Sequence, residues 1–336
     1  MVIGDWGNPI TSHQSPVTNH PFFSVFCGAM KIHHLARLTG HNAAIFALSQ
    51  GRSERHFLSA AGDGWIAEWD LDAPETGKLL AKVNAQIFSL FLLKNSPLLL
   101  AGDMNGGVHW IDLEQPERTK DVAHHRKGTF DLLDLGEHVF TCGGDGMLTR
   151  WSVAECRSLE SFQLANQALR CLDFSEKRNE IAVGASDGAI YLLDAASLEL
   201  KQRIAGAHGN SVFSIRYHPN GELLLSGGRD AHLNAYLLEN EVIKISSQPA
   251  HWFTVNSISF HPAGHFFATG SRDKTIKIWD AKLESDEGFH LLKVLEGARD
   301  DGHFNSVNKV FWSGYRGILV SCSDDRTIIL WQIEMP

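Results

Sequence analysis

The sequence predicts an all-β protein made of seven repeated units. Three observations support this. Apolar and polar residues alternate with period two between short turns, which indicates half-buried strands. A polar turn residue, acidic in most units, is followed six residues later by an aromatic or aliphatic residue. A histidine lies 22 residues before the acidic turn residue in four units.

The N-terminal residues differ from the rest of the chain. Residues 1–29 are nearly uncharged and are interrupted by prolines, so we expect a disordered extension ahead of a single domain at 30–336. An interaction tail that uses Phe22, Phe23 and Phe26 is the alternative. Residues 31–38 alternate as a strand should, and they precede the first unit.

The most regular unit runs from Ala250 to Asp280. Three stretches in it are expected to form strands, at residues 255–260, 266–270 and 275–279. Residues rich in Pro, Gly and Asp separate them and favour turns. With Trp279-Asp280 at its end, this unit resembles one repeat of the WD-repeat β-propeller family.

The same pattern recurs along the chain, with turn residues 40–43 residues apart and 52 before the last unit. The pairs of turn and strand-ending residues are Asp63/Trp69, Asn105/Ile111, Asp145/Trp151, Asp187/Leu193, Asp230/Tyr236, Asp273/Trp279 and Asp325/Trp331. The resemblance covers residues 31–331 and implies a seven-bladed β-propeller of four-stranded blades. The last unit stops soon after Trp331. We therefore expect residues 31–38 to complete it and close the ring, since closure removes a free sheet edge.

Composition restricts the function classes. The 336 residues include 43% hydrophobic and 21% charged residues, as in a soluble globular protein. A formal net charge of −9 argues against nucleic acid as the main partner. Five scattered cysteines without a CxxC pair indicate reduced thiols in the cytoplasm and no metal site. No apolar run reaches 18 residues, so we expect no membrane partner, and we expect a monomer without a cofactor.

The resemblance also implies a structural role for recurring polar residues. In the family, a histidine, a Ser or Thr, the turn Asp and a Trp form a hydrogen-bonded tetrad. The matching sets are His41/Ser59/Asp63/Trp69, His251/Thr269/Asp273/Trp279 and His303/Ser321/Asp325/Trp331, with a near-complete set of His208, Ser226 and Asp230 beside Tyr236. In the third unit Thr141, Asp145 and Trp151 match, and His125 fits best as the histidine. Because the sets recur at one spacing, we interpret them as structural and not as nucleophile triads.

Units two and four depart from this pattern. Their four positions read Val83, Ala101, Asn105 and Ile111, and Ala165, Val183, Asp187 and Leu193. We expect both blades to form, with apolar packing in place of the polar network, because removing all partners together can be nearly neutral in energy.

The binding surface predicted from the resemblance is one rim of the propeller channel. The rim-facing positions of the first strands are Phe46, Phe88, Phe130, Arg170, Phe213, Asn256 and Asn308, and the residues before two turn aspartates are Arg229 and Arg272. Exposed aromatic residues near arginine are typical of binding hot spots. Packing of the phenylalanines against one another at the channel wall is the alternative.

We therefore predict a non-catalytic WD-repeat scaffold that binds protein or peptide partners through this rim. The alternative is a propeller-based hydrolase or lyase with a site in the central channel, although no known catalytic motif favours it. Because residues 250–280 form the most regular unit, we expect specific function where the units differ. Those places are the Phe positions, Arg170, Arg229 and the acidic insertions at 284–287 and 298–302.

Overall fold

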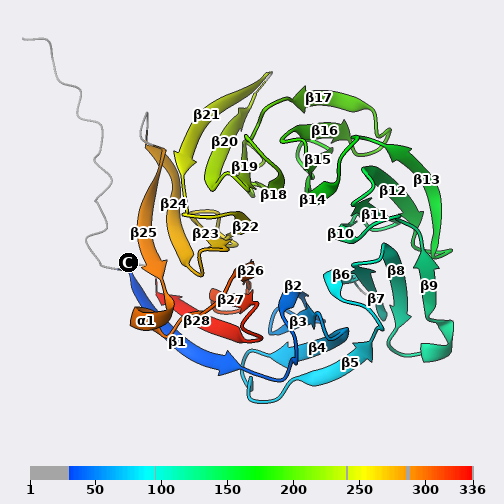
Figure 1. Ribbon diagram of the computed structural model, residues 1–336, viewed down its shortest axis with the longest axis horizontal. Coiled ribbons are helices and arrows are strands. Elements are labelled where there is room, and N and C mark those ends of the chain that lie inside the picture. Colours follow the sequence, from blue (N-terminus) through cyan, green and yellow to red (C-terminus); the bar gives the residue numbers. More distant parts are fainter. Residues whose placement is uncertain (1–29, 95, 240, 285–287, 335–336) are drawn as a thin grey trace, which may run out of the picture.

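The computed structural model describes residues 30–94, 96–239, 241–284 and 288–334. In these residues, seven four-stranded antiparallel sheets surround a central channel, so the prediction of a seven-bladed β-propeller is confirmed (Figure 1). The extension predicted at residues 1–29 lies outside the described residues. Within the described part of the chain, no helix has the length and apolar character needed to cross a membrane.

The strands of the first six blades follow one another outward from the channel (Figure 1). Blade one contains β2 (Ile45–Gln50), β3 (His56–Ala61), β4 (Trp65–Asp70) and β5 (Lys78–Lys82). Blade two contains β6 (Ile87–Leu92), β7 (Leu98–Asp103), β8 (Gly107–Asp112) and β9 (Lys120–Ala123), with the 3-10 turn η1 (Pro116–Arg118) before β9. Blade three contains β10 (Thr129–Asp134), β11 (His138–Gly143), β12 (Met147–Ser152) and β13 (Arg157–Gln163).

The second half of the ring repeats this order. Blade four contains β14 (Leu169–Ser175), β15 (Glu180–Ala185), β16 (Ile190–Asp194) and β17 (Leu200–Ile204). Blade five contains β18 (Val212–Tyr217), β19 (Leu223–Gly228), β20 (His232–Leu238) and β21 (Val242–Pro249). Blade six contains β22 (Val255–Phe260), β23 (Phe266–Ser271), β24 (Ile276–Glu284) and β25 (Gly288–Leu295), followed by the short helix α1 (Gly297–Asp300).

Blade seven closes the ring as predicted. It contains β26 (Val307–Trp312), β27 (Ile318–Ser323) and β28 (Ile328–Glu334), and β1 (Lys31–Leu38) is its outer strand. β1 runs antiparallel to β28, with Lys31 opposite Glu334 and Leu38 opposite Ile328. The first and last strands of the described chain therefore share one sheet.

The apolar core lies between neighbouring blades. At the closure, for example, Phe57 and Trp69 of blade one pack in one cluster with Ile318 and Leu330 of blade seven. Middle strands are the most buried, and outer strands such as β17 are largely exposed. This distribution is expected of sheets that pack face to face around a ring.

Blade six differs from the prediction at its outer edge. Its third strand, predicted at 275–279, continues to Glu284, so the insertion lengthens the hairpin of β24 and β25. The second acidic insertion forms α1 and is paired within the chain. Asp300 lies 3.1 Å from Arg299, and Asp301 lies 3.1 Å from Arg37.

Candidate functional site

One face of the ring, which we call the rim, carries the turns between second and third strands and the loops that precede the first strands. Backbone hydrogen bonds join these two kinds of segment. The amide of Gly62 donates to the carbonyl of Ala44 at 2.8 Å, and that of Arg272 donates to Thr254 at 3.1 Å. Because hairpins alternate direction, the loops between first and second strands lie on the opposite face.

Blade six shows how a predicted polar set is arranged. His251 Nε2 lies 2.7 Å from Thr269 Oγ1, and Trp279 Nε1 donates to the same oxygen at 2.9 Å. His251 Nδ1 lies 2.9 Å from Asp273 Oδ2. Since the carboxylate only accepts, Nδ1 carries the proton and donates to Asp273, and the unprotonated Nε2 accepts from the Thr269 hydroxyl.

The same arrangement recurs in other blades. Corresponding distances of 2.8–3.3 Å join the members of His41/Ser59/Asp63/Trp69, His125/Thr141/Asp145/Trp151 and His303/Ser321/Asp325/Trp331. In blade five, His208 contacts Asp230 at 2.9 Å and Ser226 at 2.8 Å. There the Tyr236 hydroxyl donates to the carbonyl of Ala207 at 3.4 Å.

These sets are closed to substrates. Ser59, Thr269 and Ser321 are fully buried, and each hydroxyl already contacts an imidazole and an indole. A nucleophile must instead reach its substrate. Burial lowers the pKa of His251, which keeps the ring neutral. Burial alone would raise the pKa of Asp273, but hydrogen bonds from His251 and its neighbours hold it well below the usual range. The arrangement therefore stabilises the blade interior.

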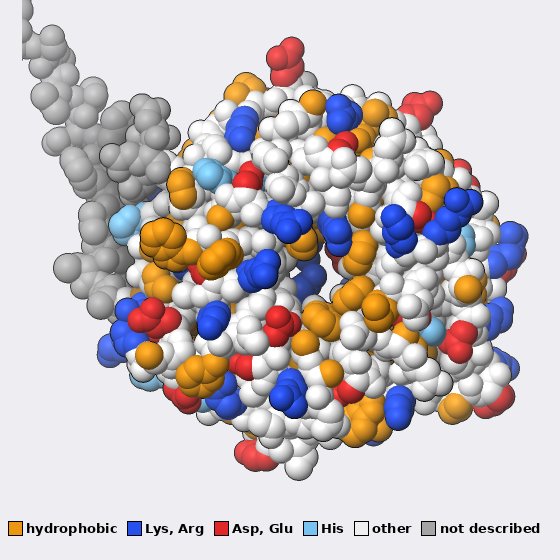
Figure 2. All heavy atoms as spheres, viewed as in Figure 1, with side chains coloured by type: hydrophobic (Ala, Val, Ile, Leu, Met, Phe, Trp, Pro, Cys, Tyr) orange, Lys and Arg blue, Asp and Glu red, His pale blue; other side chains and the backbone are white. Residues whose placement is uncertain are grey.

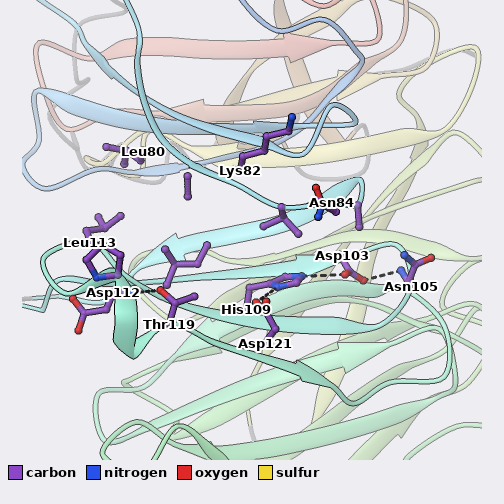
Figure 3. Close-up of a pocket in the computed structure, with 15 residues that line it drawn as sticks. Leu80, Lys82, Asn84, Asp103, Asn105, His109, Asp112, Leu113, Thr119 and Asp121 are labelled. Carbon is purple, nitrogen blue, oxygen red and sulfur yellow. Dashed lines mark hydrogen bonds and ion pairs between the residues drawn. The ribbon is translucent and has the colours of Figure 1, made fainter.

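Blade two contains a polar network that the sequence prediction missed. Val83, Ala101 and Ile111 pack in an apolar cluster as predicted, but His109 beside them lies between two aspartates (Figure 3). Its Nε2 is 3.0 Å from Asp103 Oδ2, and its Nδ1 is 2.6 Å from Asp121 Oδ1. The three side chains border a cavity of about 530 Å³ between blades one and two. They come from β7, β8 and β9, outside the four tetrad positions.

Blade four also has a substitute network. The Tyr191 hydroxyl donates to Asp187 Oδ2 at 2.8 Å, and Arg203 Nη2 donates to the same oxygen at 3.1 Å. Val183 and Leu193 pack in an apolar cluster, as predicted. In both irregular blades, the polar side chains near the turn therefore have hydrogen-bond partners within the same blade. Across the described parts of the chain, no group of three or more His, Cys, Asp or Glu side chains is placed to hold a metal ion.

The predicted phenylalanine positions form a continuous arc at the channel. The ring of Phe88 lies 5.2 Å from that of Phe46 and 5.7 Å from that of Phe130, centroid to centroid. The guanidinium of Arg170 lies 4.3 Å from the centre of Phe130 and 5.3 Å from that of Phe213. All five side chains are half-buried and line a cavity of about 240 Å³. They pack against one another and still present surface to the channel.

The two predicted asparagines also line this cavity, but their amides contact neighbouring segments. Asn256 Nδ2 donates to the carbonyl of Val307 at 2.9 Å, and Asn308 Nδ2 donates to that of Ile45 at 2.9 Å. Each bond joins one blade to the next. Both asparagines therefore brace the inner wall of the ring.

The rim also displays aromatic residues that the sequence prediction did not include. Trp252 is 87% exposed, Phe253 is 59% exposed and Phe304 is 62% exposed. Trp252 and Phe304 each follow the histidine of a tetrad. The residues at that position are Asn42, Arg126, Gly209, Trp252 and Phe304. Comparing them across the blades could have revealed the two aromatic residues. Arg229 and Arg272 are exposed on the same rim and do not line the channel cavity.

Known proteins share this repeat. The family model described as WD domain, G-beta repeat matches residues 200–236, 243–280 and 291–332. WD repeat-containing protein 90 of Xenopus tropicalis is 33% identical over 144 residues, which is 40% of this chain and 8% of that protein. Echinoderm microtubule-associated protein-like 4 of Mus musculus is 27% identical over 222 residues, 61% of this chain and 21% of that protein.

A third relative covers most of the ring. Transducin beta-like protein 3 of Rattus norvegicus is 23% identical over 304 residues, which is 89% of this chain and 33% of that protein. The chain thus spans about a third or less of these three relatives. The matched repeats, the recurring tetrads and the seven four-stranded blades agree with one another. The chain thus carries WD repeats in three matched units and has the fold of a WD-repeat β-propeller.

Proposed function

We propose that this chain is a non-catalytic scaffold that binds a protein or peptide partner on its rim. The arc of Phe46, Phe88 and Phe130 with Arg170, at the mouth of the channel, would anchor the partner. The observation that carries this proposal is the half-exposed aromatic surface that these residues leave around a cavity of about 240 Å³. Aromatic rings with a stacked guanidinium are typical of binding hot spots.

The alternative, a propeller enzyme, has less support. The recurring Ser, His and Asp side chains are the residues that most resemble catalytic groups, and their hydroxyls are buried inside the blades. The names of the relatives describe repeat-containing and microtubule-associated proteins, not enzymes. The free thiols of Cys142, Cys171 and Cys322 support a reducing compartment such as the cytoplasm.

The test is a quantitative pull-down from a lysate of the source organism with immobilised protein. We expect Phe88→Glu to reduce recovery of the specific partner at least about tenfold, since a charge replaces a hot-spot ring. Lys94→Glu is the matched control, because Lys94 is exposed in the loop between β6 and β7 on the opposite face. Circular dichroism would verify folding of both variants. Equal recovery with Phe88→Glu and wild type would place the binding site elsewhere.

A further inference from the structure

We propose that the partner segment is acidic and carries an aromatic or aliphatic residue that docks on blade six. The docking surface consists of Trp252, Phe253, Arg272 and Lys274 of blade six and Arg229 of blade five, and we call it the blade-six patch. This inference rests on the proposed rim-binding function, and it identifies the chemistry of the partner. On the face seen in Figure 2, hydrophobic side chains gather over blade six, and Lys and Arg side chains lie between them and the channel.

The aromatic part of the patch is held in place by its backbone. The amide of Trp252 donates to Asp273 Oδ2 at 3.0 Å, and Ser271 Oγ donates to the carbonyl of Phe253 at 3.3 Å. The adjacent amide of Arg272 donates to the carbonyl of Thr254. Two large apolar side chains are thus presented to solvent on an ordered loop. A preorganised aromatic surface loses little conformational entropy on binding, which favours an interaction role.

The basic side chains of the blade-six patch are available to a partner. Among the described residues, no ion pair is recorded for Arg229, Arg272 or Lys274. Arginines of the opposite face are instead paired with carboxylates of their own chain, as in Arg52–Glu68, Arg55–Asp70, Arg178–Glu180 and Arg316–Asp72. The three cations of the patch therefore remain free to contact an anionic group.

The carboxylate nearest the patch, that of Asp273, is turned inward. Asp273 accepts hydrogen bonds from His251, from the amides of Trp252 and Thr275 and from the Thr275 hydroxyl, and its side chain is 4% exposed. The charged side chains that remain exposed at this turn are the cations of Arg272 and Lys274. Such a surface is complementary to carboxylates.

The turn of blade six holds its lysine in a strained backbone conformation. The residue after the turn residue has positive φ in all seven blades, and it is glycine at 64, 106, 146 and 188. In blades six and seven, Lys274 and Arg326 occupy this position with φ of 76° and 68°. Side chains with a Cβ disfavour this left-handed conformation. Blade five has Ala231 there, with φ of 67°. Three blades thus carry a strained side chain at this turn, and in blades six and seven that side chain is basic.

A protein segment fits the patch better than a nucleic acid. Binding of a nucleic acid strand is favoured by a continuous series of cations along the phosphate backbone. The patch has three cations around two aromatic rings, on a chain whose formal net charge is −9. Short acidic sequences with one apolar residue match this size and composition.

The test uses fluorescence anisotropy with the full chain and a fluorescein-labelled synthetic peptide of Glu and Asp with one central Phe. A length of about 12 residues spans roughly 40 Å when extended. We expect saturable binding that weakens as salt rises from about 0.1 M to about 1 M, since the Debye length falls from about 10 Å to about 3 Å. Two further probes are the same peptide with Lys in place of the acidic residues, and a single-stranded oligonucleotide of matched length.

Variants then locate the site. We expect Arg229→Glu/Arg272→Glu and, separately, Trp252→Ala to weaken peptide binding at least about tenfold. Lys94→Glu, on the opposite face, should leave it unchanged. Absence of peptide binding, equal binding of the lysine peptide, tighter binding of the oligonucleotide, or no effect of the patch variants would each overturn the proposal. If the peptide results overturned this proposal but recovery of a partner in the pull-down still depended on Phe88, the proposed rim-binding function would remain supported.

Discussion

Replacement of Thr269 by valine tests whether the tetrads stabilise the blades. Valine has nearly the shape of threonine and removes only the hydroxyl. Thr269 Oγ1 is fully buried and contacts both His251 Nε2 and Trp279 Nε1. The substitution therefore leaves two buried polar groups without that partner, and each unsatisfied group costs about 1–3 kcal/mol. We expect a loss in the free energy of unfolding of about 2–4 kcal/mol.

Thermal unfolding followed by circular dichroism measures this loss. Unfolding entropy of about 2.1 cal/mol/K per residue gives roughly 0.6 kcal/mol/K for a propeller of about 300 residues. The expected decrease in Tm is therefore about 3–6 °C. Thr269→Ser, which keeps the hydroxyl, is the control and should lose less because only a methyl group is removed.

A double-mutant cycle makes this result specific. Trp279→Phe removes the indole N–H, so in the double variant the missing hydroxyl no longer leaves that donor unsatisfied. We expect the double variant to be more stable than the sum of the single losses predicts, by about 1–2 kcal/mol. A Tm of Thr269→Val within 1 °C of the control, or an additive cycle, would refute the structural role of the network.

Three further predictions concern closure, pH and the strained turn. Deletion of residues 31–38 should lower Tm sharply and promote association in size-exclusion chromatography, since β28 becomes a free edge; an unchanged melt would argue against closure by β1. Burial lowers the pKa of three blade histidines in the folded state, namely His41, His125 and His251. Their contribution to stability is therefore fully present above the unfolded-state pKa of about 6.5, and Tm should fall as the pH is lowered below that value. Burial raises the pKa of Asp173 to about 6, which opposes this trend, but it is one group against three histidines. A Tm that stayed constant between pH 7.5 and 5 would contradict the prediction for the histidines. Lys274→Gly should stabilise the protein by about 0.5–1 kcal/mol and weaken binding of the acidic peptide; a loss of stability in a thermal melt would disprove the strain.

The fold could be predicted because each blade repeats the same information. Two fixed offsets locate the tetrads, and even the uncertain His125 was identified from its spacing to the following strand. The network of His109 could not be found this way. Its partners Asp103 and Asp121 lie on neighbouring strands, and only the pairing of β7, β8 and β9 in space brings them together. Period-two patterns give the face of a side chain but not its contacts.

Exposure on the rim cannot be read from the sequence of one blade alone. Aromatic residues are usually buried, so Trp252 and Phe253 beside a strand suggest core packing. The regularity of residues 250–280 also led to the expectation that this blade has no specific role. The structure instead places two highly exposed aromatic residues in this blade, which the regular strand pattern did not predict. Regular strands and a specialised loop can share one blade because the strands fix only where the loop begins and ends.

Asp273 connects the blade interior to the blade-six patch. Its carboxylate contacts His251 inside the blade and accepts the amide of Trp252 on the rim. We therefore expect Asp273→Asn to lower stability by about 1.5–3 kcal/mol, the usual contribution of hydrogen bonds to a charged group, and also to weaken binding of the acidic peptide. Thr269→Val lies deeper and should lower stability alone. If both variants reduced peptide affinity equally at a temperature where both are folded, Asp273 would have no separate role in positioning Trp252.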